Sequence, residues 1–219
     1  MDKEKIILIG SGQHANVVLY NIKEQNKYNV VAILDSDPLK KNKLFNNIPI
    51  YSDYYDEKNL ENVRKEFGTN KFFIGFGNMK YRKNVYEYLV ANKFEAVNVI
   101  HPNAVVSPNA KIGLGVLIES GCLITPNPVI GNNVVVNTGS QVNHDNIIEN
   151  HVYIASGVIM SGGIFVGENS LIDDGVIISL GKKVGKNCII GAGGVVTKDI
   201  PENSVAYGNP ARIIRKTAQ

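Results

Sequence analysis

The chain has 219 residues, of which 44% are hydrophobic and 20% charged, and its formal net charge is +3. This length allows a sizeable core and one or two domains, and so mild a charge does not favour nucleic-acid binding. No apolar run approaches the roughly 18 residues of a membrane helix, and the N-terminus lacks the pattern of a signal peptide. Two cysteines form neither a disulfide framework nor a metal cluster. We therefore expect a cytoplasmic protein that does not insert into membranes.

The composition changes sharply near residue 100. Residues 1–99 hold 14 of the 17 aromatic residues and 15 of the 23 lysines and arginines. A shift of this kind beside a proline (Pro102) indicates a domain boundary. We expect a first domain over 1–99, a second over 100–205, and a C-terminal tail over 206–219.

The first domain has the element order of an α/β unit. Apolar runs predict strands over 6–9 and 30–34, and a later strand with its exit loop over 72–78. Helices are expected over 16–27 and 81–92. This alternation predicts a Rossmann-like fold with a parallel sheet.

A glycine turn joins the first strand to the first helix. Its sequence, Gly10-Ser11-Gly12-Gln13-His14-Ala15, has the form Gly-x-Gly-x-x-Ala and precedes Asp35 by about 20 residues. In nucleotide-binding folds such a turn places backbone N–H groups and a helix N-terminus against phosphate, while the acid receives a sugar hydroxyl. A tight turn without a ligand is the alternative. Because the unit is too short for a complete dinucleotide fold, a single nucleotide is favoured over NAD.

The second domain contains a repeat of six residues. Every sixth position from Ile100 to Val196 is apolar, and 16 of these 17 positions are Ile or Val. A period of six fits neither a helix nor a plain strand. It fits a short strand followed by a corner, so that three strands complete one coil and equivalent residues stack 18 positions apart. We therefore predict an all-β parallel β-helix of hexapeptide repeats.

One histidine of this β-helix is a candidate general base. His144 follows an inward-facing position by two residues, so its side chain is expected to point outward near a corner, next to Asp145. The equivalent position one coil later is Gly162, which leaves the surface bare beside the ring. A neutral imidazole oriented by a carboxylate can take a proton from an amine or hydroxyl. A solvent-facing histidine on a turn is the alternative.

The remaining histidines and both cysteines receive no catalytic role from their spacing. His14 lies in the glycine turn, where it either donates to phosphate or caps the helix, and His101 reads as a linker residue. His144 and His151 lack a third His or Cys ligand nearby, so no zinc site is expected. Cys122 and Cys188 occupy equivalent hexad positions and are expected to be structural.

Four segments together resemble the nucleotide-sugar acetyltransferases, among them UDP-4-amino-sugar and GDP-perosamine N-acetyltransferases and sialic acid O-acetyltransferases. The segments are Gly10–His14, Asn137–Asp145 (NTGSQVNHD), Gly191–Val196 and the terminal Gly208-Asn209-Pro210-Ala211-Arg212. The likeness spans essentially the whole chain. It implies a left-handed β-helix, acetyl-CoA as cosubstrate without a metal, and a homotrimer with active sites between subunits.

The resemblance also implies roles for individual residues. It makes His144 the base that deprotonates the acceptor and Asp145 the carboxylate that increases its basicity. The residues that it implies for the nucleotide sugar are Gly12, Gln13 and His14 at the phosphates, Asp35 and Ser36 at the nucleoside, and Gly77 and Asn78 in a loop that closes over it. Those that it implies for acetyl-CoA are Tyr153, Gly162, Asp174, Ala192, Gly193 and Lys198. The basic residues Arg212, Arg215 and Lys216 either meet the CoA phosphates or form a solvated tail.

Two residues depart from the family pattern. Tyr153 stands where relatives often carry a second histidine, and Asp145 replaces a longer Glu of some members. We expect acetyl transfer from acetyl-CoA to the amine of a UDP-linked 4-amino sugar, in surface-glycan biosynthesis. Sialic acid O-acetylation is the second reading, and a sugar-nucleotide-binding accessory protein without catalysis is the third. Base chemistry at His144 serves amine and hydroxyl acceptors alike.

Overall fold

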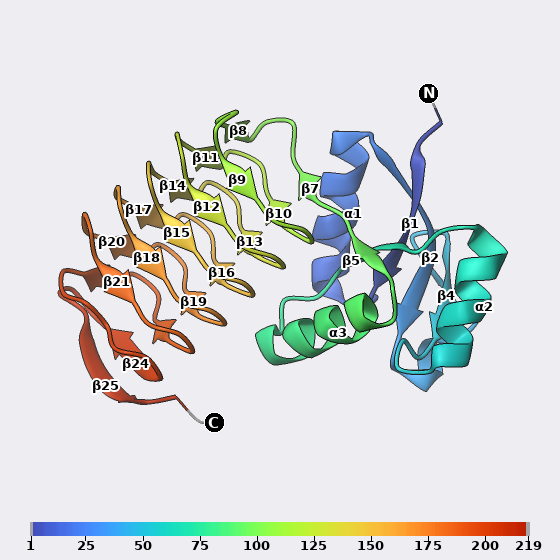
Figure 1. The fold of residues 1–219 in the computed structure, drawn as a ribbon. Helices are drawn as coiled ribbons and strands as arrows, with labels where there is room; N and C mark the ends of the chain where they lie inside the picture. Colours follow the sequence, from blue (N-terminus) through green and yellow to red (C-terminus); the bar gives the residue numbers. More distant parts are fainter. Residues whose placement is uncertain (1, 218–219) are drawn as a thin grey trace. The chain divides into compact units, whose positions relative to one another are not determined.

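The computed structural model describes residues 2–217. The chain divides between Val99 and Ile100 into two compact units, an α/β unit and a β-helical unit (Figure 1). No helix among the described residues is long and apolar enough to cross a membrane.

The first unit contains a six-stranded sheet in the order β3-β4-β2-β1-β5-β6. All neighbours pair in parallel except β3 with β4. The strands are β1 (Glu4–Ile9), β2 (Tyr28–Asp35), β3 (Leu44–Phe45), β4 (Ile48–Ser52), β5 (Lys71–Ile74) and β6 (Glu95–Ala96). The helices are α1 (Gln13–Gln25), η1 (Pro38–Lys40), α2 (Glu57–Phe67) and α3 (Met79–Ala91).

Two helices share one face of this sheet. Leu60 of α2 and Leu89 of α3 belong to the same buried cluster as Ile7 and Ile9 of β1. The first helix, α1, is absent from this cluster and lies on the opposite side of the sheet (Figure 1). Central strands buried on both faces explain why 6–9 reads as a continuous apolar run.

The predicted elements of this unit are present, with shifted bounds. The helix expected over 16–27 begins at Gln13, because Gly12 serves as its N-cap. Helix α2 and strands β3 and β4 carry weak patterns and were not predicted. Helix α2 buries only Leu60 and Val63, so its apolar stripe is short. Its ends are well marked, since Asp56 accepts hydrogen bonds from two backbone N–H groups and Gly68 takes the left-handed conformation.

The second unit is the predicted β-helix. From β8 (Val105–Val106) to β23 (Val195–Val196), a two-residue strand recurs every six residues, and β7 (Val99–Ile100) precedes them. Strands 18 residues apart pair in parallel, as in Leu117 with Val135, and build three sheets. The predicted inward positions from Ile118 to Val196 are all at most 2% exposed and form one continuous core.

The corners of the β-helix have their own period. A residue with positive φ recurs every six positions from Gly115 to Gly193. L-residues other than Asn, Asp and His rarely adopt this conformation, and here every such corner residue is Gly or Asn except Asp145 and His151. Asn169, Asn187 and Asn203 of one corner are linked by amide hydrogen bonds of 3.0 and 3.1 Å. This ladder links the side chains of successive coils.

The segment expected as a tail is part of the folded unit as far as Thr217. Strand β24 (Ser204–Tyr207) pairs in parallel with β22 (Ile189–Ile190), and β25 (Arg212–Lys216) pairs with β24 in antiparallel orientation. These strands end the eight-stranded sheet, with residues 212–216 exposed on its edge. Residues 218 and 219 of the predicted tail lie outside the described residues.

Candidate active site

The histidine–carboxylate pair lies on the corner that follows β14 (Gln141–Val142). Nδ1 of His144 is 2.9 Å from Oδ2 of Asp145, and both side chains are about 60% exposed. The Asn127 amide donates to Asp145 Oδ1 at 3.3 Å from the preceding coil. The hydrogen bond with His144, followed by that with Asn127, lowers the pKa of Asp145.

The backbone explains why an aspartate serves here. Asp145 has φ of 59° and occupies the left-handed corner position that Gly or Asn fills in most other coils. Aspartate tolerates this conformation better than glutamate, because its short carboxylate can bond locally. From this position Asp145 reaches the ring of the residue just before it, so the corner geometry itself orients His144.

Gly162 makes the space for the imidazole. A Cβ built on Gly162 would lie 2.3 Å from both Cε1 and Nε2 of His144, so the ring lies directly over this glycine. The backbone of Gly162 does not have positive φ, so the absent side chain matters for space and not for conformation. The bare surface expected beside His144 is therefore occupied by the ring.

The pair has the arrangement of a general base. When Nδ1–H donates to the Asp145 carboxylate, Nε2 is the unprotonated nitrogen and can accept a proton. The carboxylate also stabilises the imidazolium that results.

The residues implied for acetyl-CoA lie on different parts of the β-helix. Gly162 and Lys198 share the corner column of His144, one and three coils further on. Asp174, Ala192 and Gly193 lie on the preceding corner of the coil. The six-stranded sheet of the β-helix, which contains β8, β14 and β23, separates this corner from that of His144. Tyr153 belongs to β16 (Tyr153–Ile154) of the eight-stranded sheet, and its hydroxyl accepts from Asn137 Nδ2 at 3.0 Å. Apart from Tyr153, these residues are therefore divided between two corners of one chain.

A second candidate site is a pocket of about 440 Å³ in the α/β unit. It lies at the carboxyl ends of β1, β2 and β5, where the chain order reverses on the two sides of β1. Ligands of open α/β sheets bind at such a switch point. The residues that line it are Gly10, Ser11, Gly12, Asp35, Ser36, Lys40, Tyr54, Tyr55, Phe76, Asn78, Tyr81 and Asn84.

The carboxylate of Asp35 links Ser11, Asp37 and Lys40 through hydrogen bonds. Its Oδ2 accepts from the backbone N–H of Ser11 at 2.9 Å, the Ser11 hydroxyl at 2.5 Å and Lys40 Nζ at 3.0 Å. Its Oδ1 accepts from the backbone N–H of Asp37 at 3.0 Å. Burial favours a raised pKa for this carboxyl, but the hydrogen bonds outweigh burial and the pKa is lowered. The carboxylate is therefore charged, and its Oδ2 is already saturated by donors of the protein.

The predicted nucleotide-site residues are only partly brought together. Gly12, Asp35, Ser36 and Asn78 line the pocket, whereas Gln13, His14 and Gly77 do not. Asn78 also caps α3, since its side chain accepts from the Tyr81 N–H. Four further lining residues were not predicted from the sequence, namely Lys40 and the tyrosines Tyr54, Tyr55 and Tyr81. The aromatic residues that follow β4 could have indicated the pocket, because the aromatic residues of the chain are concentrated in this domain.

His14 lies at the start of α1 in a neutral state. Burial, followed by the charge of Arg82, lowers its pKa to about 4. Its Nε2 is buried and has no hydrogen-bond partner among the described residues. Helix α1 also lacks a side-chain cap and any acidic residue in its first turn. The first N–H groups of this helix therefore carry an uncompensated positive end of the helix dipole.

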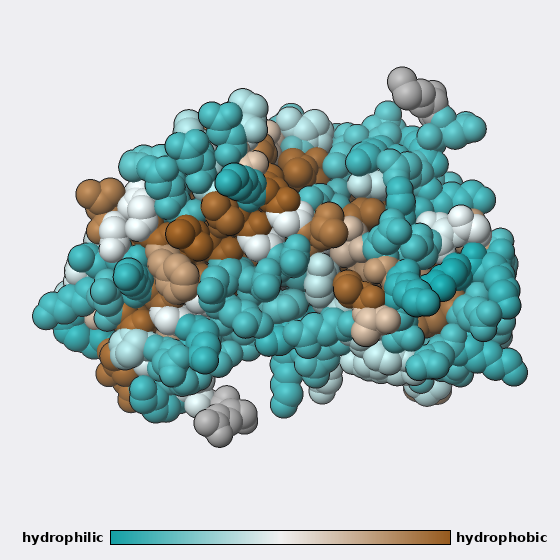
Figure 2. All heavy atoms as spheres, viewed as in Figure 1, coloured by the Kyte–Doolittle hydropathy of each residue, from teal (hydrophilic) through white to brown (hydrophobic). Residues whose placement is uncertain are grey.

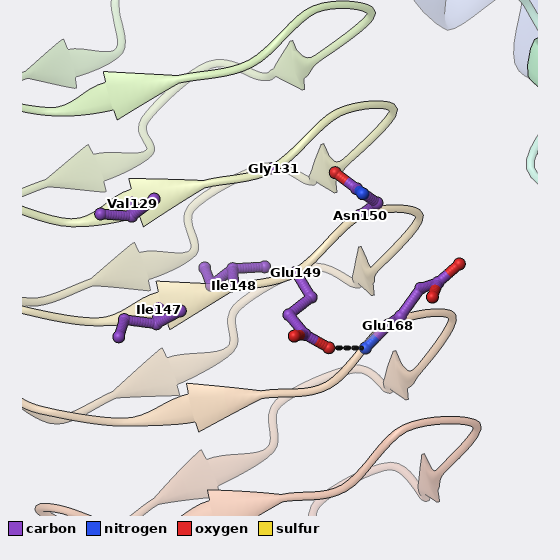
Figure 3. A pocket seen from close by; sticks show the side chains of 7 residues that line it. All are labelled: Val129, Gly131, Ile147, Ile148, Glu149, Asn150 and Glu168. Carbon is purple, nitrogen blue, oxygen red and sulfur yellow. Dashed lines mark hydrogen bonds between the residues drawn. The ribbon is translucent and has the colours of Figure 1, made fainter.

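A shallow depression of about 240 Å³ lies on the five-stranded sheet (Figure 3). Val129 and Ile147 form one side of it, while Glu149 and Glu168 stand at the other, where Glu149 Oε2 accepts from the Glu168 N–H at 2.8 Å. Hydrophobic side chains gather over the strands of this sheet in Figure 2. Val129 is 41% exposed and Ile147 is 47% exposed.

The cysteines are poor nucleophiles. Both are buried. Burial is the main cause that raises the pKa of Cys122, to about 11, and that of Cys188. Because the thiolate is the reactive form, these values agree with the expected structural role.

Comparison with known proteins supports both units. Residues 5–89 match the PglD N-terminal domain family. UDP-N-acetylbacillosamine N-acetyltransferase of Bacillus subtilis (strain 168) is 31% identical over 117 residues, which are 52% of this chain. The match spans about half (51%) of the length of that curated relative.

Two solved structures resemble nearly the whole chain. A histidine mutant of perosamine N-acetyltransferase from Caulobacter crescentus, in complex with CoA and GDP-perosamine, is 31% identical over 97% of both chains, with a TM-score of 0.88. The acetyltransferase domain of PglB from Neisseria gonorrhoeae FA1090, in complex with acetyl coenzyme A, is 28% identical with a TM-score of 0.85. It is matched over 97% of this chain and 100% of that domain.

These similarities confirm the predicted fold, an α/β unit followed by a left-handed parallel β-helix. Fold and site together define the class of hexapeptide-repeat acetyltransferases that carry an N-terminal α/β domain. Within this class, the chain belongs to the nucleotide-sugar acetyltransferase family.

Proposed function

We propose that the protein transfers the acetyl group of acetyl-CoA to the amine of a nucleotide-linked amino sugar, of the UDP-4-amino-sugar type, for surface-glycan biosynthesis. The observation that carries this proposal is the His144–Asp145 pair over Gly162, at an exposed corner of the β-helix. The named relatives, which act on UDP-N-acetylbacillosamine or bind GDP-perosamine with CoA, support the substrate class. The free, buried thiols of both cysteines fit a reducing compartment, and we place the reaction in the cytoplasm.

In the proposed reaction, His144 acts as general base in a direct transfer. The sugar amine attacks the carbonyl carbon of the acetyl thioester, and its proton passes to Nε2 of His144. The tetrahedral intermediate collapses as the C–S bond breaks, and the proton on His144 passes to the departing CoA sulfur. A backbone N–H of the neighbouring coil stabilises the oxyanion. Asp145 holds the ring and stabilises its protonated form.

The pocket of the α/β unit is the proposed nucleotide site. Its glycine loop and the uncapped end of α1 offer N–H groups to phosphate, and we keep Gly12, Gln13 and His14, at the start of this helix, as the residues proposed for the phosphates. We assign the nucleoside contact to Ser36 in preference to Asp35, whose carboxylate already accepts four hydrogen bonds. Gly77 and Asn78 follow β5 and belong to the loop proposed to close over the nucleotide.

We further propose a homotrimer with acetyl-CoA bound between subunits. Apart from Tyr153, the proposed acetyl-CoA residues occupy two corners of one chain, so a site that uses both sets requires His144 and Gly162 of one copy and Asp174 and Ala192 of the next. The two sheets that meet at the His144 corner present exposed apolar residues to solvent, which is typical of an interface. These residues are Val105, Ile159 and Ile177 on one sheet, and Val129 and Ile147 on the other.

Subunit complementation tests the shared site. His144→Ala and Ala192→Trp each remove activity in the proposal, one through the base and the other by filling the acetyl-CoA groove. When the two inactive proteins are mixed, dissociated and reassembled, some sites combine an intact His144 with an intact Ala192. Activity should then return to a fraction of the wild-type value. Full assembly without any recovery would contradict a site formed between copies.

Acceptor identity is tested with labelled acetyl-CoA and a panel of acceptors. The panel contains UDP- and GDP-linked 4-amino sugars, CMP-sialic acid and free sialic acid. We expect turnover with a nucleotide-linked amino sugar, and the hydroxyl-only acceptors should be unlabelled. Labelling of sialic acid would instead support O-acetyl transfer. Binding of a nucleotide sugar without turnover of any acceptor would support an accessory protein.

A further inference from the structure

One cation lines the nucleotide pocket of the α/β unit. Among the lining residues, Lys40 is the single lysine or arginine, and it lies at the end of η1. Its Nζ is 3.0 Å from Asp35 Oδ2, and that same oxygen accepts from the hydroxyl of Ser11 at 2.5 Å. Nζ of Lys40 therefore lies within two hydrogen-bond lengths of the glycine loop.

The carboxylate that holds Lys40 is largely occupied by donors of the protein itself. Its Oδ2 receives three donors, from Ser11 and Lys40, which is more than the two lone pairs of one oxygen, and its Oδ1 receives the N–H of Asp37. Asp35 is only 7% exposed. It is thus a positioning residue, which fixes the ammonium group of Lys40 beside the glycine loop.

Lys40 keeps donors for a ligand. An ammonium group has three N–H donors, and the structure gives Lys40 one side-chain acceptor, Asp35. Its side chain is 35% exposed, so the other two donors are accessible from the pocket. The N–H groups of the glycine loop and of the α1 N-terminus are the second set of anion donors at this place.

We propose that Lys40 binds the diphosphate of the nucleotide sugar and makes the site selective for nucleoside diphosphates over monophosphates. Two neighbouring sets of donors suit two linked phosphoryl groups, since one can contact the glycine loop while the other contacts Lys40. A monophosphate engages only one set. This inference rests on the proposed function and adds to it a residue that determines specificity for the diphosphate.

Calorimetric titration of the whole chain with nucleotides tests this role. UDP and UMP form one pair and GDP and GMP another, and the comparison uses the base that the wild-type protein binds. Lys40→Gln should weaken diphosphate binding by about 10- to 30-fold, the range for losing a partly exposed charge-assisted contact. Monophosphate binding should change by less than about threefold. Lys40→Arg should retain most of the preference for the diphosphate.

Two further variants separate the proposed role from a general effect on the fold. Lys41→Gln, at an exposed lysine outside the pocket lining, should change neither affinity. Asp35→Asn should lower the diphosphate preference, and its effect should not add to that of Lys40→Gln. In steady-state assays, Lys40→Gln should raise KM for the nucleotide sugar and leave KM for acetyl-CoA unchanged.

The outcomes distinguish this inference from the proposed function. If Lys40→Gln leaves diphosphate binding unchanged, or weakens both nucleotides equally, the role of Lys40 is wrong while the proposed function stands. If the wild-type protein binds no nucleotide and acetylates no nucleotide sugar, the proposed function fails and the inference fails with it.

Discussion

The two units of this protein build their sites in opposite ways. In the β-helix, each strand pairs with the strand 18 residues away, and His144, Asp145 and Gly162 come from one corner and its equivalent a single coil later. In the α/β unit, the pocket gathers residues from the ends of β1, β2 and β5, which are separated by tens of residues. The first site is a local departure from a repeat, and the second is a convergence of distant segments.

This difference determines which site residues can be identified from the sequence alone. A repeat sets an expectation for every position, so a residue that breaks it stands out. Asp145 interrupts a series of Gly and Asn corner residues, and His151 is the other interruption. The α/β unit has no repeat that gives an expected residue type at each position. Only the folded sheet shows that Lys40 and Ser11 share one carboxylate oxygen of Asp35.

Neighbouring isoleucines of β15 (Ile147–Ile148) separate the core of the β-helix from its surface. Ile148 is 1% exposed and Ile147 is 47% exposed. Ile148→Ala should lower the free energy of unfolding by about 2 to 5 kcal/mol through lost burial and a cavity. Ile147→Ala should cost the folded subunit less than about 1 kcal/mol and should raise the concentration at which the assembly dissociates. Equal costs in chemical denaturation would contradict the assigned register.

The α/β unit should respond to pH through His14. Its pKa falls from 6.5 to about 4 on folding, so the unfolded state binds more protons between these values. Stability is therefore complete above about pH 6.5 and decreases as pH falls towards 4, by at most about 3 kcal/mol. His14→Gln should flatten this part of the profile in urea unfolding. A slope that survives in His14→Gln would contradict this source.

Two glycines of the β-helix lack a side chain for different reasons: one leaves room for a catalytic side chain and the other for the backbone of the next coil. Gly162→Ala should displace the imidazole of His144 and lower kcat by about 100-fold, in line with loss of a general base, while the melting temperature is nearly unchanged. A Cβ on Gly131 would instead lie 2.8 Å from the backbone nitrogen of Asn150 in the next coil. Gly131→Ala should therefore destabilise the fold. Full activity of Gly162→Ala would place the working position of His144 elsewhere.

The corner ladder should show the smallest effect. Asn187 has φ of 55° and bonds to Asn169 and Asn203. Asn187→Gly removes the bonds but keeps the left-handed conformation accessible, whereas Asn187→Ala also strains the backbone. The alanine variant should be less stable than the glycine variant by about 1 kcal/mol, measured by thermal unfolding. The reverse order would contradict a conformational role for these corners.

The sequence predicted the β-helix almost completely because one inward residue per face is a physical requirement that recurs in every coil. It also singled out His144, Asp145 and Gly162 from their positions in the hexads. The strand 212–216 and the second half of the strand 204–207 fell within the expected tail, because the six-residue period ends at Val196 while the sheet continues. Lys40, Tyr54 and Tyr81 were missed, since their meeting depends on the strand order and no local pattern encodes it.

The central claim is that His144 is the general base of acetyl transfer. The most direct measurement is kcat of His144→Ala with the preferred nucleotide amino sugar and acetyl-CoA, alongside its melting temperature and assembly state. We predict a loss of about 10²- to 10⁴-fold in kcat, with the fold and assembly unchanged because the side chain is exposed. An unchanged kcat in a correctly assembled variant would contradict the account.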